Sequence, residues 1–285
     1  MACSSISFVG ARPPMAHLVA GYATSHTGMM IRTFDREDPV QVRVHRAFGQ
    51  LREEIATLAP DVIVMVSSEH LNSFFYDCYP QFCVALGKES QGWGDAGVAA
   101  RSVPIAGDFS QHLLECGIIE GFDLAWAAEP KLDHGFLCPL SLLTPEFDIP
   151  VVPLFMNSST PPLPTFQRCA ALGAMIGRAI EARASDERVV LLAGGGLSHW
   201  VATPEMGEVN PVFDRWFLDC LVRGDLDAVT ALDTDDVGRR AGNGGQEIRN
   251  WITAMAACNG RAEVLCYEPV TRWGTGIALA RLSAA

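Results

Sequence analysis

The sequence predicts an α/β fold: a single domain with a mainly parallel or mixed central sheet flanked by helices. Apolar runs of strand length alternate with amphipathic helical segments along most of the 285 residues, as in sheets whose strands are joined by helices. Several runs, such as "VIVMV" at 62–66, are apolar at every position, which is typical of strands covered on both faces. Because no repeat or linker-like stretch interrupts the alternation, we expect one domain over residues 1–285.

The first elements are predicted from hydrophobic periodicity. The run "HLVAGYATSH" at 17–26 is a strand candidate. A stripe of apolar residues spaced three and four apart predicts an amphipathic helix over 42–58. The segment 61–70 is apolar on both parities and predicts a second strand.

The middle of the chain continues the alternation. Short apolar runs predict strands at 80–87 and 122–129, with a helix over 108–119 between them. A further strand is expected at 149–157, and after a proline-rich turn a helix is expected over 165–183.

The last third begins with "RVVLLAGGG" at 188–196, which predicts another covered strand. Amphipathic helices are expected over 211–222 and 245–258. Two β-rich segments, 262–269 and 274–282, are expected to close the sheet.

Composition excludes several classes of function. The net charge is −12 and no cluster of lysine or arginine is visible, so nucleic acid is excluded as a partner. Apolar runs are too short to cross a bilayer, and no basic amphipathic helix predicts membrane binding. Residues 1–21 lack a basic segment and contain Pro13-Pro14, unlike a signal peptide, and the nine cysteines show no CxxC spacing. We therefore expect a cytoplasmic protein with reduced thiols.

Histidines stand where predicted strands end. His26 ends the first strand, His70 ends the second, and His199 follows the late strand in "GGGLSHW". His134 follows another predicted strand in "LDHGF". Because ligands of open α/β sheets bind beyond the carboxyl ends of strands, these imidazoles are expected to converge.

Glu247, in "GNGGQEIRNW", is the candidate carboxylate. It lies in the first turn of a predicted helix, one turn before the core-facing Trp251, so its side chain points partly inward, where an unpaired carboxylate is costly. A simple alternative is an acid favoured by the helix dipole. Two imidazoles and one carboxylate suit a non-haem Fe(II) centre with positions left for substrate and O2.

Other classes of site use similar residues. The same donors suit zinc, and a hydrolase could use Glu247 or His199 to activate metal-bound water. A non-catalytic binding protein on the same fold is a further alternative. Ser198 beside His199 could also be a nucleophile with its base, although adjacent residues rarely orient toward one another.

Taken together, these motifs resemble the catalytic subunit of the class III (LigB-type) extradiol ring-cleavage dioxygenases. The matching stretches, in family order, are "TSHTG", "SSEHLNSFFYDCYPQFCVALG", "LDHGFLCPL", "VPLFMNSSTPPLPTFQRCAALGAMIGRAI", "GGGLSHW" and "GGQEIRNW". They cover the chain from about residue 17 to its last strands. "FFYDCYPQFC" and "PLPTFQR" are similar to 2,3-dihydroxyphenylpropionate 1,2-dioxygenases, whereas "GWG" and "NPVFD" are similar to protocatechuate 4,5-dioxygenase β chains and gallate-type relatives.

The resemblance implies a LigB-like fold and a role for each matched residue. The family's iron ligands fall on His26, His70 and Glu247. Its two catalytic histidines fall on His199 and His134. The implied reaction is extradiol (meta) cleavage by O2 of a catechol-type aromatic, such as protocatechuate, gallate or a side-chain-substituted catechol, to a muconic semialdehyde-type product. His199 would take a proton from the catechol, and His134 would donate a proton or orient oxygen in later steps.

The resemblance also bears on substrate fit and partners. Gly28 replaces a proline that often stands two residues after the family's first ligand, which affects loop shape more than metal binding. Candidate substrate-binding residues are Arg272, Trp273 and Thr275 in "TRWGTG". A substrate carboxylate could pair with Arg272, or this residue could be an exposed arginine in a turn. Some relatives need a small lid subunit, so we expect either such a partner or a homo- or hetero-oligomer.

Overall fold

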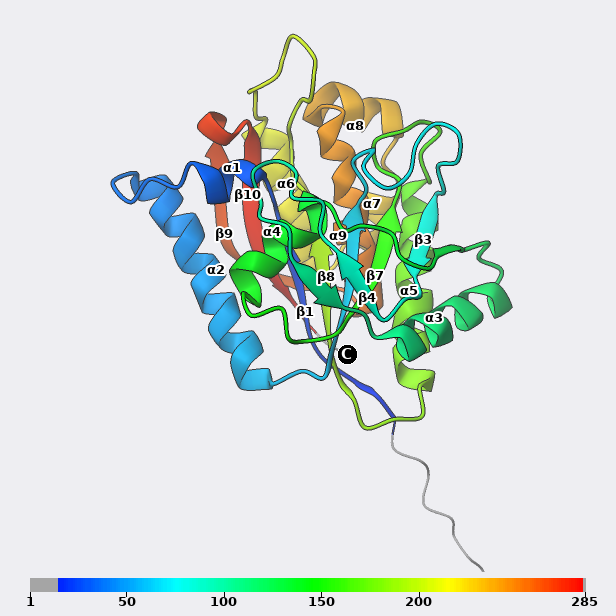
Figure 1. Cartoon of the computed structure of the whole chain (residues 1–285). Coiled ribbons are helices and arrows are strands. Elements are labelled where there is room, and N and C mark those ends of the chain that lie inside the picture. Colours follow the sequence, from blue (N-terminus) through cyan, green and yellow to red (C-terminus); the bar gives the residue numbers. More distant parts are fainter. Residues whose placement is uncertain (1–14, 284–285) are drawn as a thin grey trace, which may run out of the picture.

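The computed structural model describes residues 15–283 and confirms the predicted α/β fold, with one mixed sheet between layers of helices (Figure 1). The central sheet has eight strands in the order β6-β3-β7-β2-β8-β1-β10-β9. They are β1 (His17–Thr24), β2 (Val62–Ser68), β3 (Phe82–Ala85), β6 (Ala125–Ala127), β7 (Val151–Met156), β8 (Arg188–Gly194), β9 (Ala262–Val270) and β10 (Thr275–Leu282). Each corresponds to one predicted strand. A small second sheet of β4 (Glu89–Gln91) and β5 (Ser102–Pro104) was not predicted.

Strand direction explains where the site forms. Strands β7, β2, β8 and β1 are neighbours and run parallel. Strand β3 is antiparallel to β7, β6 is parallel to β3, and β10 and β9 add antiparallel strands at the other side. The carboxyl ends of β2, β8 and β1 therefore lie side by side, at the edge where ligands bind in such sheets.

The helices match the prediction in part. The structure contains every helix that the sequence predicts: α2 (Pro39–Leu58), α3 (Gly107–Ile119), α5 (Phe166–Ala182), α6 (Pro211–Arg223) and α9 (Ile248–Ala257). Not predicted are α1 (Gly28–Arg32), α4 (His134–Leu143), α7 (Leu226–Thr230) and α8 (Thr234–Ala241). The helix expected over 245–258 begins as a 3-10 turn, η1 (Gly244–Glu247), and a second such turn, η2 (Thr271–Trp273), precedes β10.

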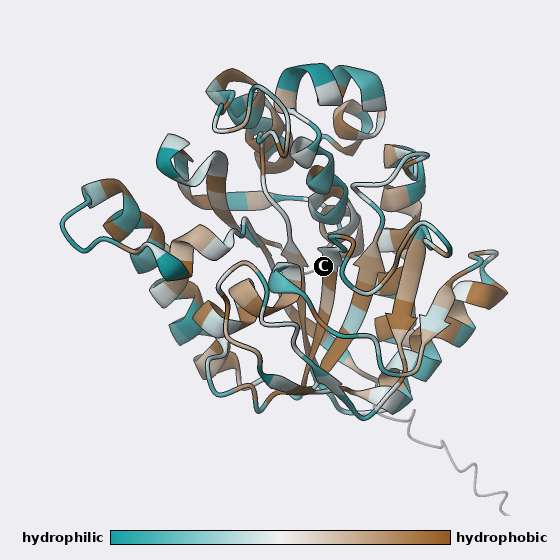
Figure 2. Cartoon of the chain, turned by 45° about the horizontal axis from the view of Figure 1, so that its top comes forward, coloured by the Kyte–Doolittle hydropathy of each residue, from teal (hydrophilic) through white to brown (hydrophobic). Residues whose placement is uncertain are grey.

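Apolar side chains cover both faces of the sheet, as the runs without alternation predict. In β2, Val62, Val64 and Val66 pack in one core with α3, α5 and α9, whereas Ile63 and Met65 pack in the other with α2 and α4. Figure 2 shows the strands of the sheet mostly in hydrophobic colours and the surrounding helices with mixed faces. At about 25 cal/mol per Å² of buried apolar surface, this burial on two faces is the main stabilising term.

Composition led us to expect no membrane-spanning segment and reduced cysteines, and the described residues can be compared with both expectations. None of the helices in residues 15–283 combines the length and apolar character needed to cross a bilayer. The eight cysteines in this range are all free. Cys3 and most of the segment examined for a signal peptide, residues 1–14, lie outside the described residues.

Candidate active site

His26 lies two residues beyond β1 and is buried, with 6% of its surface exposed. The residue before it is tied to β10: the Ser25 N–H donates to the Ala278 carbonyl, and the Ala278 N–H donates to Ser25 Oγ. The Nδ1 atom of His26 is buried and has no hydrogen-bond partner. Burial disfavours the charged ring and lowers the pKa of His26 to about 3. A neutral imidazole with an unused nitrogen is suited to bind a metal ion.

His70 follows β2 and is held by a buried carboxylate. Its backbone N–H and its ring Nδ1 both reach Asp133 Oδ2, at 3.0 and 2.9 Å. Its other nitrogen, Nε2, lies 2.8 Å from Glu247 Oε1. Because ionised carboxylates only accept hydrogen bonds, both ring nitrogens must carry protons in this arrangement. Burial alone would lower the pKa of His70, but Asp133 and Glu247 raise it well above the ordinary value.

Glu247 ends the η1 turn and is 4% exposed. Its Oε2 atom accepts the Gly196 N–H, and Oε1 faces His70. Burial would raise the pKa of Glu247, but the nearby histidines His26 and His70 lower it below the ordinary range. Asp133 behaves similarly, with a pKa lowered to about 2 by the His70 ring and backbone against the effect of burial. The site therefore holds two buried carboxylates whose positive partners are imidazoles.

Glycines bring His199 and Glu247 together. A Cβ at Gly196 would meet His199 Nδ1 at 2.8 Å, and a Cβ at Gly244 would meet His199 Nε2 at 2.1 Å. The backbone is also clamped, because the His199 N–H donates to Ala241 and the Gly244 N–H donates to the His199 carbonyl. The ring of His199 donates from Nδ1 to the Leu197 carbonyl at 2.9 Å, which leaves Nε2 free to accept a proton.

Gly244→Ala is expected to displace the ring of His199, which the sequence predicts to be catalytic, and to lower kcat by about 100-fold, because misplacing a catalytic group by about 1 Å costs that much. The measurement is steady-state turnover together with metal content, which we expect to be unchanged. Gly49→Ala, whose Cβ would meet nothing within 4 Å, is the matched control and should keep wild-type turnover. Equal kcat for the two variants would contradict the placement of His199.

His134 reaches the site by a different route from the one the sequence indicated. It was expected at the exit of a strand, but β6 runs antiparallel to β2, so its carboxyl end lies at the opposite edge. The chain returns through residues 128–133, and His134 is the first residue of α4. Its Nδ1 lies 2.5 Å from Asp95 Oδ2, and the same oxygen accepts Asn72 Nδ2 at 3.0 Å.

The Asp95 loop also explains Gly28. A Cβ at Gly28 would meet the Ala96 carbonyl oxygen at 2.1 Å, so only glycine allows α1 to pack against this loop. Gly28 therefore makes room for the segment that carries Asp95.

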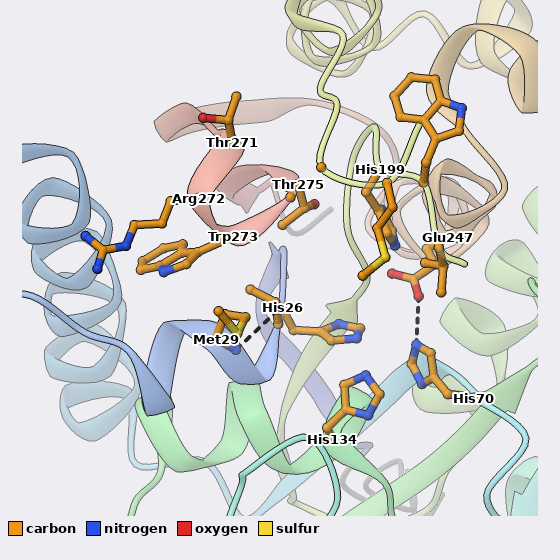
Figure 3. A pocket seen from close by; sticks show the side chains of 16 residues that line it. His26, Met29, His70, His134, His199, Glu247, Thr271, Arg272, Trp273 and Thr275 are labelled. Atoms are coloured by element: carbon orange, nitrogen blue, oxygen red, sulfur yellow. Dashed lines mark hydrogen bonds and ion pairs between the residues drawn. The ribbon is translucent and has the colours of Figure 1, made fainter. Parts of the chain in front are cut away.

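The side chains of these residues converge (Figure 3). The ring centroids of His26 and His70 are 5.3 Å apart, those of His26 and His134 are 5.4 Å apart, and those of His70 and His134 are 4.2 Å apart. One ligand atom from each of these three rings lies within 4.8 Å of the others. Glu247 joins the group through its contact with His70. Side chains that follow β1 and β2, or that belong to α4 and η1, are far apart in sequence and thus meet at one place.

Ser198 does not form a nucleophile–base pair with His199. It is fully buried, its Oγ donates to Asp214 Oδ2 at 2.9 Å, and it accepts the Asn210 N–H at 2.7 Å. Asp214 also accepts the Ser198 N–H and the Tyr267 hydroxyl. Burial raises the pKa of Asp214. This network, which the sequence did not indicate, anchors the turn that carries His199.

The convergent residues line a cavity of about 690 Å³. Of the candidate substrate-binding residues, Thr275 and Trp273 are 3% and 5% exposed and border this cavity. The Arg272 side chain is 63% exposed, lies 3.8 Å from Asp35 Oδ2 and points away from the histidines (Figure 3). Its conformation is that of an exposed arginine in a turn.

Known proteins are similar to this chain in sequence and in fold. Residues 20–278 match the family described as the catalytic LigB subunit of aromatic ring-opening dioxygenase. A 2,3-dihydroxyphenylpropionate/2,3-dihydroxicinnamic acid 1,2-dioxygenase from Klebsiella pneumoniae subsp. pneumoniae is 29% identical over 304 residues, covering 90% of this chain and 95% of the relative. Enzymes of the same name from Burkholderia vietnamiensis and Photorhabdus laumondii are each 31% identical, covering 85% and 90% of this chain and 90% and 94% of the relatives.

A solved structure of an uncharacterized protein from Escherichia coli K12 has a TM-score of 0.59 at 18% identity, covering 93% of this chain and 99% of that chain, which shows a shared fold. With the match over residues 20–278, the chain belongs to the LigB family of catalytic subunits and is an aromatic ring-cleavage dioxygenase.

Proposed function

We propose that this enzyme carries out extradiol (meta) cleavage of a catechol-type aromatic by O2, with Fe(II) held by His26, His70 and Glu247. What supports the proposal is that these three side chains line one cavity: Glu247 Oε1 lies 2.8 Å from His70 Nε2, the rings of His26 and His70 are 5.3 Å apart, and His26 Nδ1 has no hydrogen-bond partner. The residues fit a divalent ion, because a cation beside Glu247 would take the place of the His70 proton that now neutralises the carboxylate. Such a centre suits Fe(II) with open positions.

The second carboxylate supports the same assignment. Asp133 holds His70 by Nδ1, which fixes the ring so that Nε2 is the nitrogen offered to a metal ion. A bound Fe(II) would supply positions for the two diol oxygens and for O2, and electron transfer between them. Glu247 and the two imidazoles then act only as ligands, which leaves the other two histidines for proton transfer.

His199 is assigned the role of general base. Its Nδ1–H is committed to the Leu197 carbonyl, so Nε2 can take a proton from a catechol hydroxyl. His134, oriented by Asp95, is assigned as the proton donor or oxygen-orienting group of the later steps. Both side chains line the same cavity as the proposed ligands.

The proposal extends to the organisation of the protein. We propose that the chain is organised as one catalytic domain, as its sequence predicts, and that its substrate is a small aromatic diol. A small lid subunit or a further copy of the chain is proposed to cover the cavity, and recovery of a co-purifying small polypeptide would identify the former. The cytoplasmic location expected from composition stays a prediction.

The experiment is O2 uptake after anaerobic reconstitution with Fe(II). We expect uptake and coloured ring-fission products with a panel of catechols that includes protocatechuate, gallate and 2,3-dihydroxyphenylpropionate. The zinc-loaded protein is the control and should consume no O2, because zinc has no redox chemistry. Equal uptake by the two forms, or none with Fe(II), would contradict the proposal.

A further inference from the structure

We propose that the preferred substrate is a catechol with an apolar alkyl or aryl substituent, in preference to one whose substituent ends in a carboxylate. This inference rests on the proposed function and names the substrate class of the same site. Its starting point is the part of the cavity wall that follows His199 in the chain. There the segment between His199 and α6 contributes Trp200, Val201 and Met206.

These side chains are apolar and open to solvent. Val201 is 49% exposed and Met206 is 70% exposed, although both border the cavity. Exposed large apolar side chains gathered at a cavity mark a surface that a ligand covers. An apolar substituent lying there would remove its own surface and that of the wall from water, at about 25 cal/mol per Å².

The wall is held in place by the backbone of Val201. Its N–H donates to Asn243 Oδ1 at 2.8 Å, and its carbonyl accepts Asn243 Nδ2 at 2.9 Å. Asn243 also precedes the η1 turn that carries Glu247. The apolar surface is therefore fixed relative to the proposed metal ligands, so a substituent on a ring bound there meets a prepared surface.

A carboxylate on the substituent would find one arginine and no lysine among the described residues that line the cavity. Among the described side chains that line it, Arg272 is the only lysine or arginine. Its guanidinium points away from the histidines and pairs with Asp35 (Figure 3). Burying a carboxylate without a partner is costly, and the net charge of −12 repels anions at longer range.

The size of the cavity agrees with a substituted ring. Its volume of about 690 Å³ lies in the range of pockets that hold drug-sized ligands, which are larger than a bare catechol. Val201 and Met206 border this volume. A substituent therefore has both room and apolar contacts.

The test compares 3-propylcatechol with 2,3-dihydroxyphenylpropionate, which carry side chains of similar length ending in a methyl group and a carboxylate. We expect kcat/KM for 3-propylcatechol to be higher by about tenfold. From catechol through 3-methylcatechol to 3-propylcatechol it should rise roughly fourfold per methylene. Anaerobic quenching of tryptophan fluorescence, with Trp200 and Trp273 at the cavity, should give dissociation constants in the same order.

Three variants locate the preference. Val201→Asp should remove the advantage of 3-propylcatechol, whereas Val212→Asp, at an exposed valine on α6 away from the cavity, is the matched control and should keep it. Arg272→Ala should leave the ratio of kcat/KM between the two substrates unchanged. Three outcomes would overturn the inference while O2 uptake persists. They are a wild-type preference for 2,3-dihydroxyphenylpropionate, a selective loss of activity on this acid in Arg272→Ala, and equal effects of the two valine variants. No uptake with any catechol would overturn the proposed function as well.

Discussion

Glu247→Ala is expected to abolish metal binding and ring cleavage together. The carboxylate is 4% exposed, bound by the Gly196 N–H and by His70, and it is the negatively charged ligand of the proposed centre. Replacing a residue that only supports a metal ligand lowers metal affinity by about 10- to 100-fold, so replacing a ligand itself should lower metal affinity by more. The measurement is metal stoichiometry after anaerobic loading, with O2 uptake on the same sample.

Two controls separate this loss from a loss of folding. Glu247→Gln keeps the size of the side chain and an oxygen that can accept the Gly196 N–H, yet it removes the charge, so it should also bind iron weakly while unfolding at a temperature close to that of the wild type. Arg272→Ala, at an exposed side chain, should keep full metal content. One iron per chain in Glu247→Ala would show that this carboxylate is not a ligand.

His199→Ala is expected to retain iron and to lose turnover. A positioned general base contributes about 10²- to 10⁴-fold, and His199 is assigned this role by its free Nε2 beside the cavity. The measurement is kcat for one catechol at saturating substrate, with metal content determined in parallel. His17→Ala, at a surface histidine whose side chain is 64% exposed, is the control. Normal kcat in His199→Ala would exclude the assignment.

The strands and three of the histidines could be predicted because the signal is local. An apolar run at both parities marks a strand covered on two faces, and β2, β8 and β1 show it. Since these strands are adjacent and parallel, the residues that follow them meet at one edge, as expected for His26, His70 and His199.

Other features depend on contacts that no local pattern reveals. Helix α4 was missed because "HGFLCPLSLL" is apolar around its whole circumference and contains Pro139, so it shows no helical periodicity. The sequence predicts His134 at the site because a strand ends before it. However, β6 is parallel to β3 and therefore ends at the opposite edge of the sheet, so His134 reaches the site through the segment that follows β6. Asp95 contacts His134 across 39 residues of the chain, and Asp214 in α6 contacts Ser198 across 16.

The proposed metal centre is tested most directly by a crystal structure of the protein loaded anaerobically with Fe(II). We expect one ion per chain bonded to the side chains of His26, His70 and Glu247, with His134 and His199 beside it and not bonded to it. An ion held by His26, His70 and His134 without Glu247, or located elsewhere, would contradict the assignment on which the proposed chemistry depends.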